Sequence, residues 1–315
     1  MRAVRFHDYG PPSALTVDEL PDPTPGPGEV LIEVTAAGIN FSDVQLRAGA
    51  LRQWAPGLPL PFTPGHEVAG TVIATGPGAD PALAGRRVIA LSPAGGGYAE
   101  LATVPEAAVL PAPDLGEHEA LAVLTQGTTA VGLMAEAAVS PGETVLVEAA
   151  TGGVGGLLVQ LAKHAGATVV AAVGDEKKAA IARELGADRT VDLTAADDVG
   201  PVQVVFESVG GPLTRTALDL LEPTTGRMVL YGNLSGLPHE IDPAVLYQRA
   251  LSVIAFATAL LPPERLAPLR DRAFALAAEG VLRPRIGSVR PLAEAAAVHQ
   301  AMEDRATTGK NILVP

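Results

Sequence analysis

The sequence predicts an α/β protein in which a doubly wound parallel sheet is accompanied by a smaller β-barrel domain. Residues 118–261 alternate between short β-rich apolar runs and helix-period runs, which is typical of a parallel sheet. One strand-to-helix junction carries the glycine-rich turn 150–155. Residues 1–117 contain short strands separated by glycine and proline, which favours a compact barrel. At 315 residues the chain is long enough for both domains.

Composition excludes several classes of partner. The net charge is −13, with 22 Lys and Arg against 35 Asp and Glu, so we expect no nucleic-acid partner and no anionic membrane surface. The apolar run 251–261 is too short for a bilayer, which needs about 20 residues. The chain has no cysteine, which excludes disulfides and cysteine-ligated zinc and fits a cytoplasmic location.

The first domain is predicted to be discontinuous. Its strands are expected at 15–19, 29–34, 67–73 and 87–90. Helical patterns at 265–280 and 292–305 precede a last strand at 311–314. Because a lone strand has no partner of its own, this strand should pair back into the barrel. The predicted domains are therefore 1–117 with 262–315, and 118–261.

The second domain reads as six parallel strands with helices between them. Strands are expected at 144–148, 168–173, 189–192, 202–206, 226–231 and 251–256. Helices are expected at 155–164, 176–185 and 212–221. Six parallel strands joined in this way make a doubly wound sheet.

The glycine-rich turn predicts a dinucleotide site. Its candidate cofactor-binding residues are Ala150, Thr151, Gly152, Gly153, Val154 and Gly155. Gly152 would let the backbone approach the phosphates, and Gly155 would let the helix sit close on the strand. The helix N-terminus would supply N–H groups and positive potential. The alternative is an ordinary strand-to-helix turn without a ligand.

Motifs spread over almost the whole chain resemble the zinc-free medium-chain dehydrogenases/reductases of the quinone oxidoreductase (zeta-crystallin-like) type. They are the segments 36–43, 64–70, 127–130, 150–155, 206–211, 226–232 and 309–313. The resemblance implies a GroES-like catalytic domain, a Rossmann domain and an active site in the cleft between them. It also implies NADPH as cofactor, a small-molecule quinone or other α,β-unsaturated carbonyl as substrate, and a homodimer joined through its nucleotide domains. We place that interface at the apolar edge strand 251–256.

Two alternatives remain open. An enoyl or enone reductase of a biosynthetic pathway would use the same fold and cofactor, and the segment 38–43 also resembles enoyl reductase domains of polyketide synthases. A non-catalytic NADPH-binding protein, such as the lens crystallins of this family, belongs to a different class.

The chain also resembles the zinc alcohol dehydrogenases, in which a cysteine stands where this sequence has Asn40. His66 and Glu67 are present, but one His and one Glu are fewer than the three protein ligands of a catalytic zinc. We therefore expect no metal site. His66 and Glu67 are instead predicted to form local hydrogen bonds where a strand begins.

Asn40, Asp43 and Thr129 are the candidate catalytic residues. The resemblance places Asn40 and Asp43 at the nicotinamide end of the cleft, where an amide could orient an acceptor oxygen. The alternative is that they only cap a turn or a short helix. The segment 127–130 touches the nicotinamide in relatives, and Thr129 is its candidate contact, although a threonine there could equally be an N-cap.

Cofactor choice is predicted to depend on the end of the second parallel strand. Val173 stands where an NAD-type acid is expected, Gly174 leaves space, and Lys178 is the candidate partner of the NADPH phosphate. Asp175 argues against this, unless it caps the following helix. The resemblance adds three further cofactor contacts: Val209, Asn233 and Lys310.

Overall fold

The computed structural model describes residues 1–53, 55–195 and 199–315, which form two compact units. The first unit comprises Met1–Ala122 and Ile286–Pro315, and the second comprises Val123–Arg285. This division differs from the expected domain boundary after residue 261. Helix α8 (Pro263–Ala278) packs on α3 (Thr128–Ala137), so residues 263–285 lie in the second unit.

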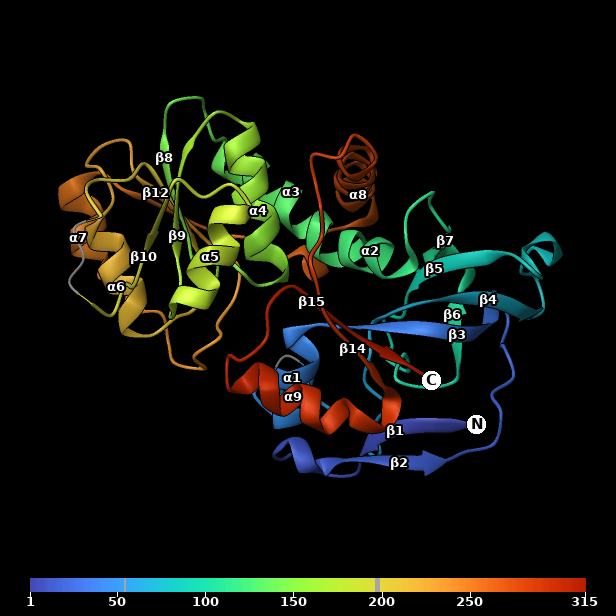
Figure 1. The fold of residues 1–315 in the computed structure, drawn as a ribbon. Coiled ribbons are helices and arrows are strands. Elements are labelled where there is room, and N and C mark those ends of the chain that lie inside the picture. The colour runs from blue at the N-terminus through green and yellow to red at the C-terminus, as the bar shows by residue number, and fades with distance from the viewer. Residues whose placement is uncertain (54, 196–198) are drawn as a thin grey trace. The chain divides into compact units, whose positions relative to one another are not determined.

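The first unit is built on a seven-stranded sheet with the order β14-β15-β3-β4-β5-β7, in which β6 also pairs with β3 (Figure 1). Its strands are β3 (Glu29–Ile39), β4 (Glu67–Thr75), β5 (Arg87–Leu91), β6 (Leu101–Pro105), β7 (Val109–Pro111), β14 (Ile286–Pro291) and β15 (Lys310–Val314). A two-stranded sheet is made by β1 (Arg2–Phe6) and β2 (Leu15–Glu19). Buried apolar side chains such as Phe6, Ile32 and Val104 form the core of this unit.

The last strand pairs as predicted. β15 runs antiparallel to β3, with Leu313 opposite Ala37 and Asn311 opposite Ile39. Strand β14, which pairs with β15, was not predicted, because its sequence Ile286–Pro291 contains glycine, arginine and proline. The helices of this unit are α1 (Phe41–Ala48), α2 (Glu117–Ala122) and α9 (Ala295–Glu303).

The second unit contains a six-stranded parallel sheet with the order β10-β9-β8-β11-β12-β13. The strands are β8 (Thr144–Val147), β9 (Thr168–Ala172), β10 (Arg189–Val191), β11 (Val204–Glu207), β12 (Arg227–Leu230) and β13 (Ser252–Ala255). In sequence order this is third, second, first, fourth, fifth and sixth, the strand order of a dinucleotide-binding doubly wound sheet. The predicted fold class is therefore confirmed.

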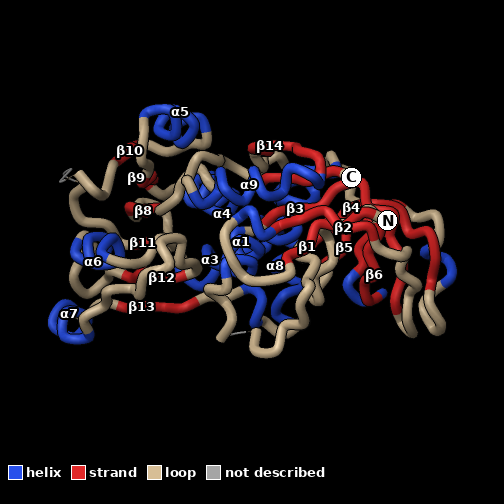
Figure 2. Tube along the Cα trace, turned by 90° about the horizontal axis from the view of Figure 1, so that it is seen from below, coloured by secondary structure: helices blue, strands red, loops and turns tan. Residues whose placement is uncertain are grey.

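Helices flank both faces of this sheet. Figure 2 shows α6 (Pro212–Asp219) and α7 (Pro243–Arg249) on one side of the stacked strands and α3 and α4 (Gly153–His164) on the other. Helix α5 (Glu176–Glu184) joins β9 to β10. The core side chains Leu146, Val170, Val205 and Met228 come from four neighbouring strands, and each is buried.

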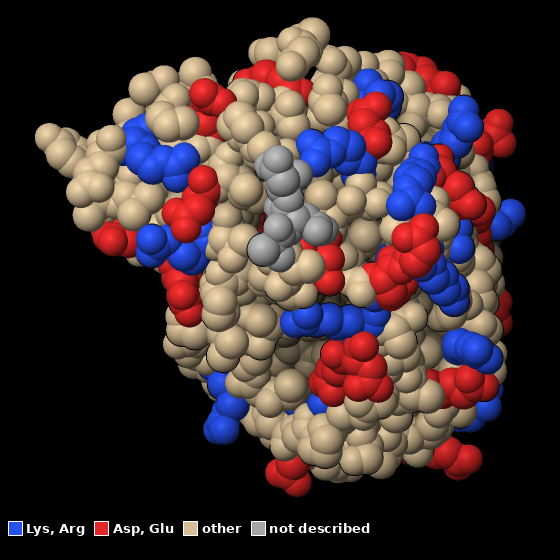
Figure 3. Space-filling model, turned by 60° about the vertical axis from the view of Figure 1, so that its left-hand side comes forward, with Lys and Arg blue, Asp and Glu red and all other residues tan. Residues whose placement is uncertain are grey.

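Charged side chains of both signs are intermixed on the face shown in Figure 3. Lys163 with Asp188, Arg183 with Glu176 and Arg215 with Asp219 are exposed ion pairs of the second unit. Within the described ranges, no helix combines the length and apolar character that a membrane span requires.

Candidate functional site

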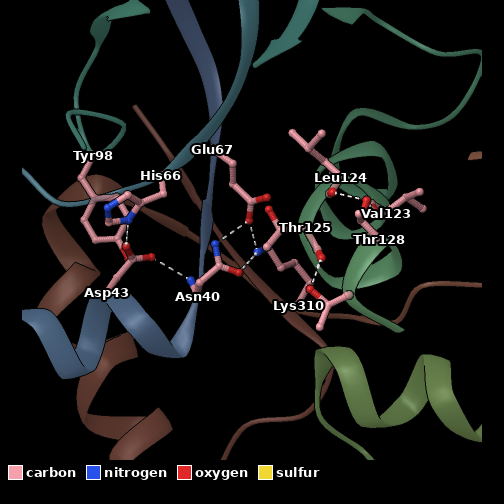
Figure 4. A network of polar contacts seen from close by, with 11 residues as sticks. Asn40, Asp43, His66, Glu67, Tyr98, Val123, Leu124, Thr125, Thr128 and Lys310 are labelled. Carbon is pink, nitrogen blue, oxygen red and sulfur yellow. Dashed lines mark hydrogen bonds and ion pairs between the residues drawn. The ribbon is translucent and has the colours of Figure 1, made fainter. Parts of the chain in front are cut away.

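Three strand ends of the first unit bring a set of polar side chains together (Figure 4). Asn40 follows β3, Glu67 begins β4 and Lys310 begins β15. The three positions converge because β3 pairs with both neighbours, with Ala37 opposite Val68 on β4 and Asn311 opposite Ile39 on β15. Residues distant in the sequence thus meet at one end of β3.

The side-chain amide of Asn40 is held from both ends. Its Nδ2 donates to Glu67 Oε1 at 3.0 Å, and its Oδ1 accepts from Lys310 Nζ at 3.0 Å. Lys310 also forms an ion pair with Glu67, and both of these side chains are completely buried. A buried charge pair keeps its position because separating it would leave an uncompensated charge. The amide orientation of Asn40 is therefore determined by its two charged partners.

One expectation changes at this cluster. The local hydrogen bonds predicted for His66 and Glu67 are wrong, since Glu67 binds Asn40 and Lys310 and His66 binds Asp43. The donor set does not fit zinc, because Glu67 already neutralises an ammonium and Asn40 offers no thiolate. Among the residues that the structure describes, no three or more His, Cys, Asp or Glu side chains are grouped so that they could hold a metal ion.

Asp43 connects the start of α1 to the rest of the first unit. One oxygen accepts the backbone N–H of Asn40 at 2.8 Å, and the other lies 2.6 Å from His66 Nδ1. Burial opposes ionisation of Asp43, but the hydrogen bond from His66 and the backbone N–H lower its pKa overall. Burial likewise opposes the charge on His66, but Asp43 raises its pKa overall. The two side chains thus form an ion pair. Asn40 is the N-cap of α1 and Asp43 lies in its first turn, as the capping interpretation of these residues expected.

Tyr98 and His299 extend this cluster into the core. Tyr98 donates to Asp43 at 3.4 Å and lies 3.1 Å from His299 Nε2, and both rings are completely buried. Burial, together with the charge of Asp43, raises the pKa of Tyr98 well above its ordinary value. Burial lowers the pKa of His299 to about 4, so this imidazole is neutral near pH 7. Sequence reasoning missed both residues, because neither belongs to a recognised motif.

Thr129 lies in the second unit and is not an N-cap. Helix α3 begins at Thr128 after a π-helical turn, Val123–Gly127, and Gly127 occupies the N-cap position. The hydroxyl of Thr129 donates to the carbonyl of Thr125 and lies 2.8 Å from the hydroxyl of Thr258. π-Helical turns occur often at functional sites, so the local backbone is compatible with a ligand contact here.

The glycine-rich turn has the tight geometry that close helix packing requires. Gly152 is the N-cap of α4, and its N–H donates to the carbonyl of Ala149 at 2.8 Å. A Cβ on Gly155 would lie 2.2 Å from that same carbonyl oxygen. No helical turn precedes Gly153, Val154 and Gly155 to accept their N–H groups. These donors are at the carboxyl end of the central strand β8, which is where doubly wound sheets bind a pyrophosphate.

Val209 and Asn233 lie on neighbouring loops at the same edge of the sheet. They follow β11 and β12, and the loops join through Ser235 N donating to Val209 O at 2.8 Å. Gly210 is constrained here, since a Cβ would lie 2.6 Å from the side-chain oxygen of Asn233. The structure thus collects the predicted residues 150–155, Val209 and Asn233 on the carboxyl edge of one sheet.

Lys178 lies in the first turn of α5, the helix that follows β9. Asp175 caps this helix, accepting the N–H of Lys178 at 2.8 Å, as its capping interpretation expected. The Lys178 ammonium lies 3.7 Å from the Asp175 carboxylate. Gly174 faces open space, because a Cβ added at this residue would have no other atom within 4 Å. The strand end therefore has both room and a cation for a phosphate group.

The predicted site residues fall into two groups. Asn40, Asp43 and Lys310 share the cluster of the first unit, whereas Thr129, the turn 150–155, Gly174, Lys178, Val209 and Asn233 belong to the second unit. Sequence reasoning assigned Lys310 to the cofactor and missed its pairing with Glu67 and Asn40. The only sequence signal was the Gly-Lys-Asn pattern before the last strand.

Comparison with known proteins gives the same two-part organisation. Residues 26–114 match the alcohol dehydrogenase GroES-like domain, and residues 153–273 match the zinc-binding dehydrogenase family. A quinone oxidoreductase of Pseudomonas aeruginosa is 33% identical, covering 100% of this chain and 99% of that protein. A 2-haloacrylate reductase of a Burkholderia species is 32% identical, covering 99% and 98%. The structure of Escherichia coli quinone oxidoreductase complexed with NADPH is 31% identical, covers 100% of both chains and has a TM-score of 0.90.

Fold and site together define a medium-chain dehydrogenase/reductase with a GroES-like unit and a dinucleotide-binding unit. Within that class, the chain belongs to the quinone oxidoreductase family.

Proposed function

We propose that this protein is an oxidoreductase that transfers hydride from NADPH to quinones or other α,β-unsaturated carbonyl compounds. The observation that carries the proposal is the turn 149–155, where Gly155 packs on the carbonyl of Ala149 at the carboxyl end of β8. The names of the relatives support the acceptor class, since one is a quinone oxidoreductase and another a 2-haloacrylate reductase.

Residues of the second unit would hold the dinucleotide. The N–H groups at the start of α4 would bind the pyrophosphate, and Lys178 would bind the phosphate that distinguishes NADPH from NADH. Val209 and Asn233 would contact the nicotinamide half, because their loops lie at the same sheet edge. When bound, NADPH supplies the hydride.

Asn40 would orient the acceptor. Glu67 uses one hydrogen of the Nδ2 amide group, and the other can donate to an acceptor oxygen. Lys310 adds positive charge at the amide oxygen and strengthens Nδ2 as a donor, since linked hydrogen bonds polarise one another. Asp43 would act indirectly, by holding the backbone of Asn40 at the start of α1.

The acceptor class follows from where negative charge develops. Reduction of an isolated carbonyl places a full charge on one oxygen, which zinc enzymes stabilise with a Lewis acid. Hydride addition to a quinone or an enone spreads the charge over a conjugated system, so a neutral amide donor such as Asn40 suffices. The protein should therefore reduce conjugated acceptors without a metal and show little alcohol oxidation. A homodimer and a cytoplasmic location complete the proposal.

A side-by-side assay tests this function. NADPH oxidation should be followed with a simple quinone, an enone and an acyl thioester, each with and without a chelator. We expect turnover of the quinone or the enone, unaffected by the chelator, and a loss of at least about tenfold in the Asn40→Ala variant. Preference for the thioester would support the biosynthetic enoyl reductase, and NADPH binding without turnover would support a non-catalytic role. Alcohol oxidation that a chelator abolishes and zinc restores would refute the proposal.

A further inference from the structure

Two glutamates lie side by side at the carboxyl end of the parallel sheet, and neither has a role in the function proposed above. Glu148 directly follows β8, and Glu207 is the last residue of β11. The register pairs Val147 with Phe206, so Glu148 and Glu207 are the next neighbours on adjacent parallel strands. Their exposed fractions are 1% and 0%. Buried acidic side chains in this position require partners or a proton.

Glu148 connects its own strand to the loop after β11. Its Oε2 accepts the backbone N–H groups of Ser208 and Val209, each at 3.1 Å. Its Oε1 is buried and has no hydrogen-bond partner among the described residues. Glu148, which precedes the glycine-rich turn, thus holds the backbone of Val209 in the loop after β11.

Glu207 is held by a different set of groups. Its Oε1 accepts from Gly210 N at 2.6 Å and from Thr214 Oγ1 at 2.9 Å, and its Oε2 lies 3.0 Å from His239 Nδ1. Like Oε1 of Glu148, Oε2 of Glu207 is buried and forms no hydrogen bond within the described part of the chain.

The electrostatic environment of Glu148 favours its neutral form. Burial, and then the negative charge of Glu207, raise the pKa of Glu148 from its usual 4.5 to about 8, although the two backbone N–H groups act in the opposite direction. Tyr231 follows β12 and is influenced by both glutamates, and burial raises its pKa, so it remains neutral.

We propose that Glu148 is a positioning residue for the dinucleotide: through the two hydrogen bonds that its Oε2 accepts, it holds the loop carrying Val209 beside the glycine-rich turn. The inference rests on the proposed NADPH function. The neutral form of Glu148 also keeps an additional negative charge away from the backbone that would bind the pyrophosphate. Loss of the proton leaves two adjacent buried carboxylates, which repel each other and loosen this sheet edge.

Unfolding without cofactor tests whether Glu148 is protonated in the folded protein. Because the pKa of Glu148 is raised in the folded state, the folded protein binds more protons than the unfolded chain between about pH 4.5 and pH 8. The stability of the wild type relative to the Glu148→Gln variant should therefore fall across this window and level off above it. In Glu207→Gln the corresponding fall should be smaller, because the neighbouring charge is gone. The exposed control Glu264→Gln should follow the wild type. Parallel profiles for wild type and Glu148→Gln would overturn the proposal.

NADPH titration tests the positioning role. Glu148→Ala leaves two N–H groups without an acceptor and should raise the NADPH dissociation constant by about tenfold or more. Glu148→Gln keeps an acceptor oxygen and should restore binding to within about threefold. Above about pH 8 the wild type should lose affinity more steeply than Glu148→Gln. Equal pH dependence of affinity in these two proteins refutes positioning, even if Glu148→Ala does not fold. A wild type that binds no NADPH refutes the positioning role and the proposed function, whereas the cofactor-free profiles still decide whether Glu148 is protonated in the folded protein.

Discussion

At the scale of single residues, cofactor choice is predicted to depend on Lys178. Its ammonium lies 3.7 Å from Asp175, at a strand end where Gly174 leaves open space. Replacing Lys178 by Ala should weaken NADPH binding by the value of one charged hydrogen bond, ~1.5 to 3 kcal/mol or roughly tenfold or more, and barely change NADH binding. Fluorescence titration with both cofactors measures this, and the exposed Lys177→Ala is the matched control with a smaller effect. Equal weakening of both cofactors would refute the assignment.

His299 carries a prediction about pH at the same scale. Burial lowers its pKa from 6.5 to about 4, so the unfolded chain binds more protons than the folded protein between these values. Above about pH 6.5 His299 is neutral in both states and does not reduce stability. As the pH falls toward 4, the unfolded chain takes up the proton first, and the free energy of unfolding falls by about 3 kcal/mol. In the His299→Gln variant the free energy of unfolding should fall less between about pH 6.5 and pH 4.5. Chemical denaturation at both pH values decides this, with the exposed His164→Gln as control. A variant as acid-sensitive as the wild type would contradict it.

At the scale of elements, the junction of β8 and α4 depends on Gly155. Alanine is normally the better helix former by about 1 kcal/mol, but a Cβ here would lie 2.2 Å from the Ala149 carbonyl oxygen. The clash should outweigh the propensity, so Gly155→Ala should destabilise the protein by about 1–3 kcal/mol and weaken NADPH binding. Denaturation of Gly174→Ala, where the Cβ has open space, should differ from wild type by no more than about 0.5 kcal/mol. A stabilised Gly155→Ala variant would show that the turn can relax.

At the scale of the whole molecule, we predict a homodimer formed through β13. This strand is the edge of the six-stranded sheet, and an uncovered edge can pair with another chain. Tyr247 and Leu260, in the segments before and after β13, are 89% and 82% exposed. Phe256 N donates to β12, and Ser252 N donates to the residue directly before β12. Because the N–H groups alternate in direction along a strand, Ala255 N points outward.

Proline at Ala255 tests this interface. Ala255→Pro removes an outward N–H and should convert the dimer to monomer, whereas Ala255→Thr keeps the N–H and should leave the dimer intact. Light scattering at micromolar concentration distinguishes the two states. A monomeric wild type would remove the prediction, and a dimeric proline variant would place the interface elsewhere.

The sequence alone determined the features that depend on neighbouring residues. The alternation of strands and helices, the turn 150–155 and the helix cap at Asp175 are local patterns of propensity and backbone geometry, and all are present in the structure. The return of the last strand to the sheet of the first unit was also predictable, because an unpaired strand leaves its backbone groups without partners.

Only the tertiary structure decided which distant side chains meet. Lys310 and Glu67 are 243 positions apart, and their pairing follows from the place of β3 between β4 and β15. Glu148 and Glu207 are neighbours because their strands share a register, and α8 belongs to the second unit because it packs on α3. Strand order and helix packing result from many weak long-range contacts summed over the chain, which no local pattern encodes. The sequence therefore predicted the dinucleotide turn, whereas the charge partners of Asn40 became visible only in the fold.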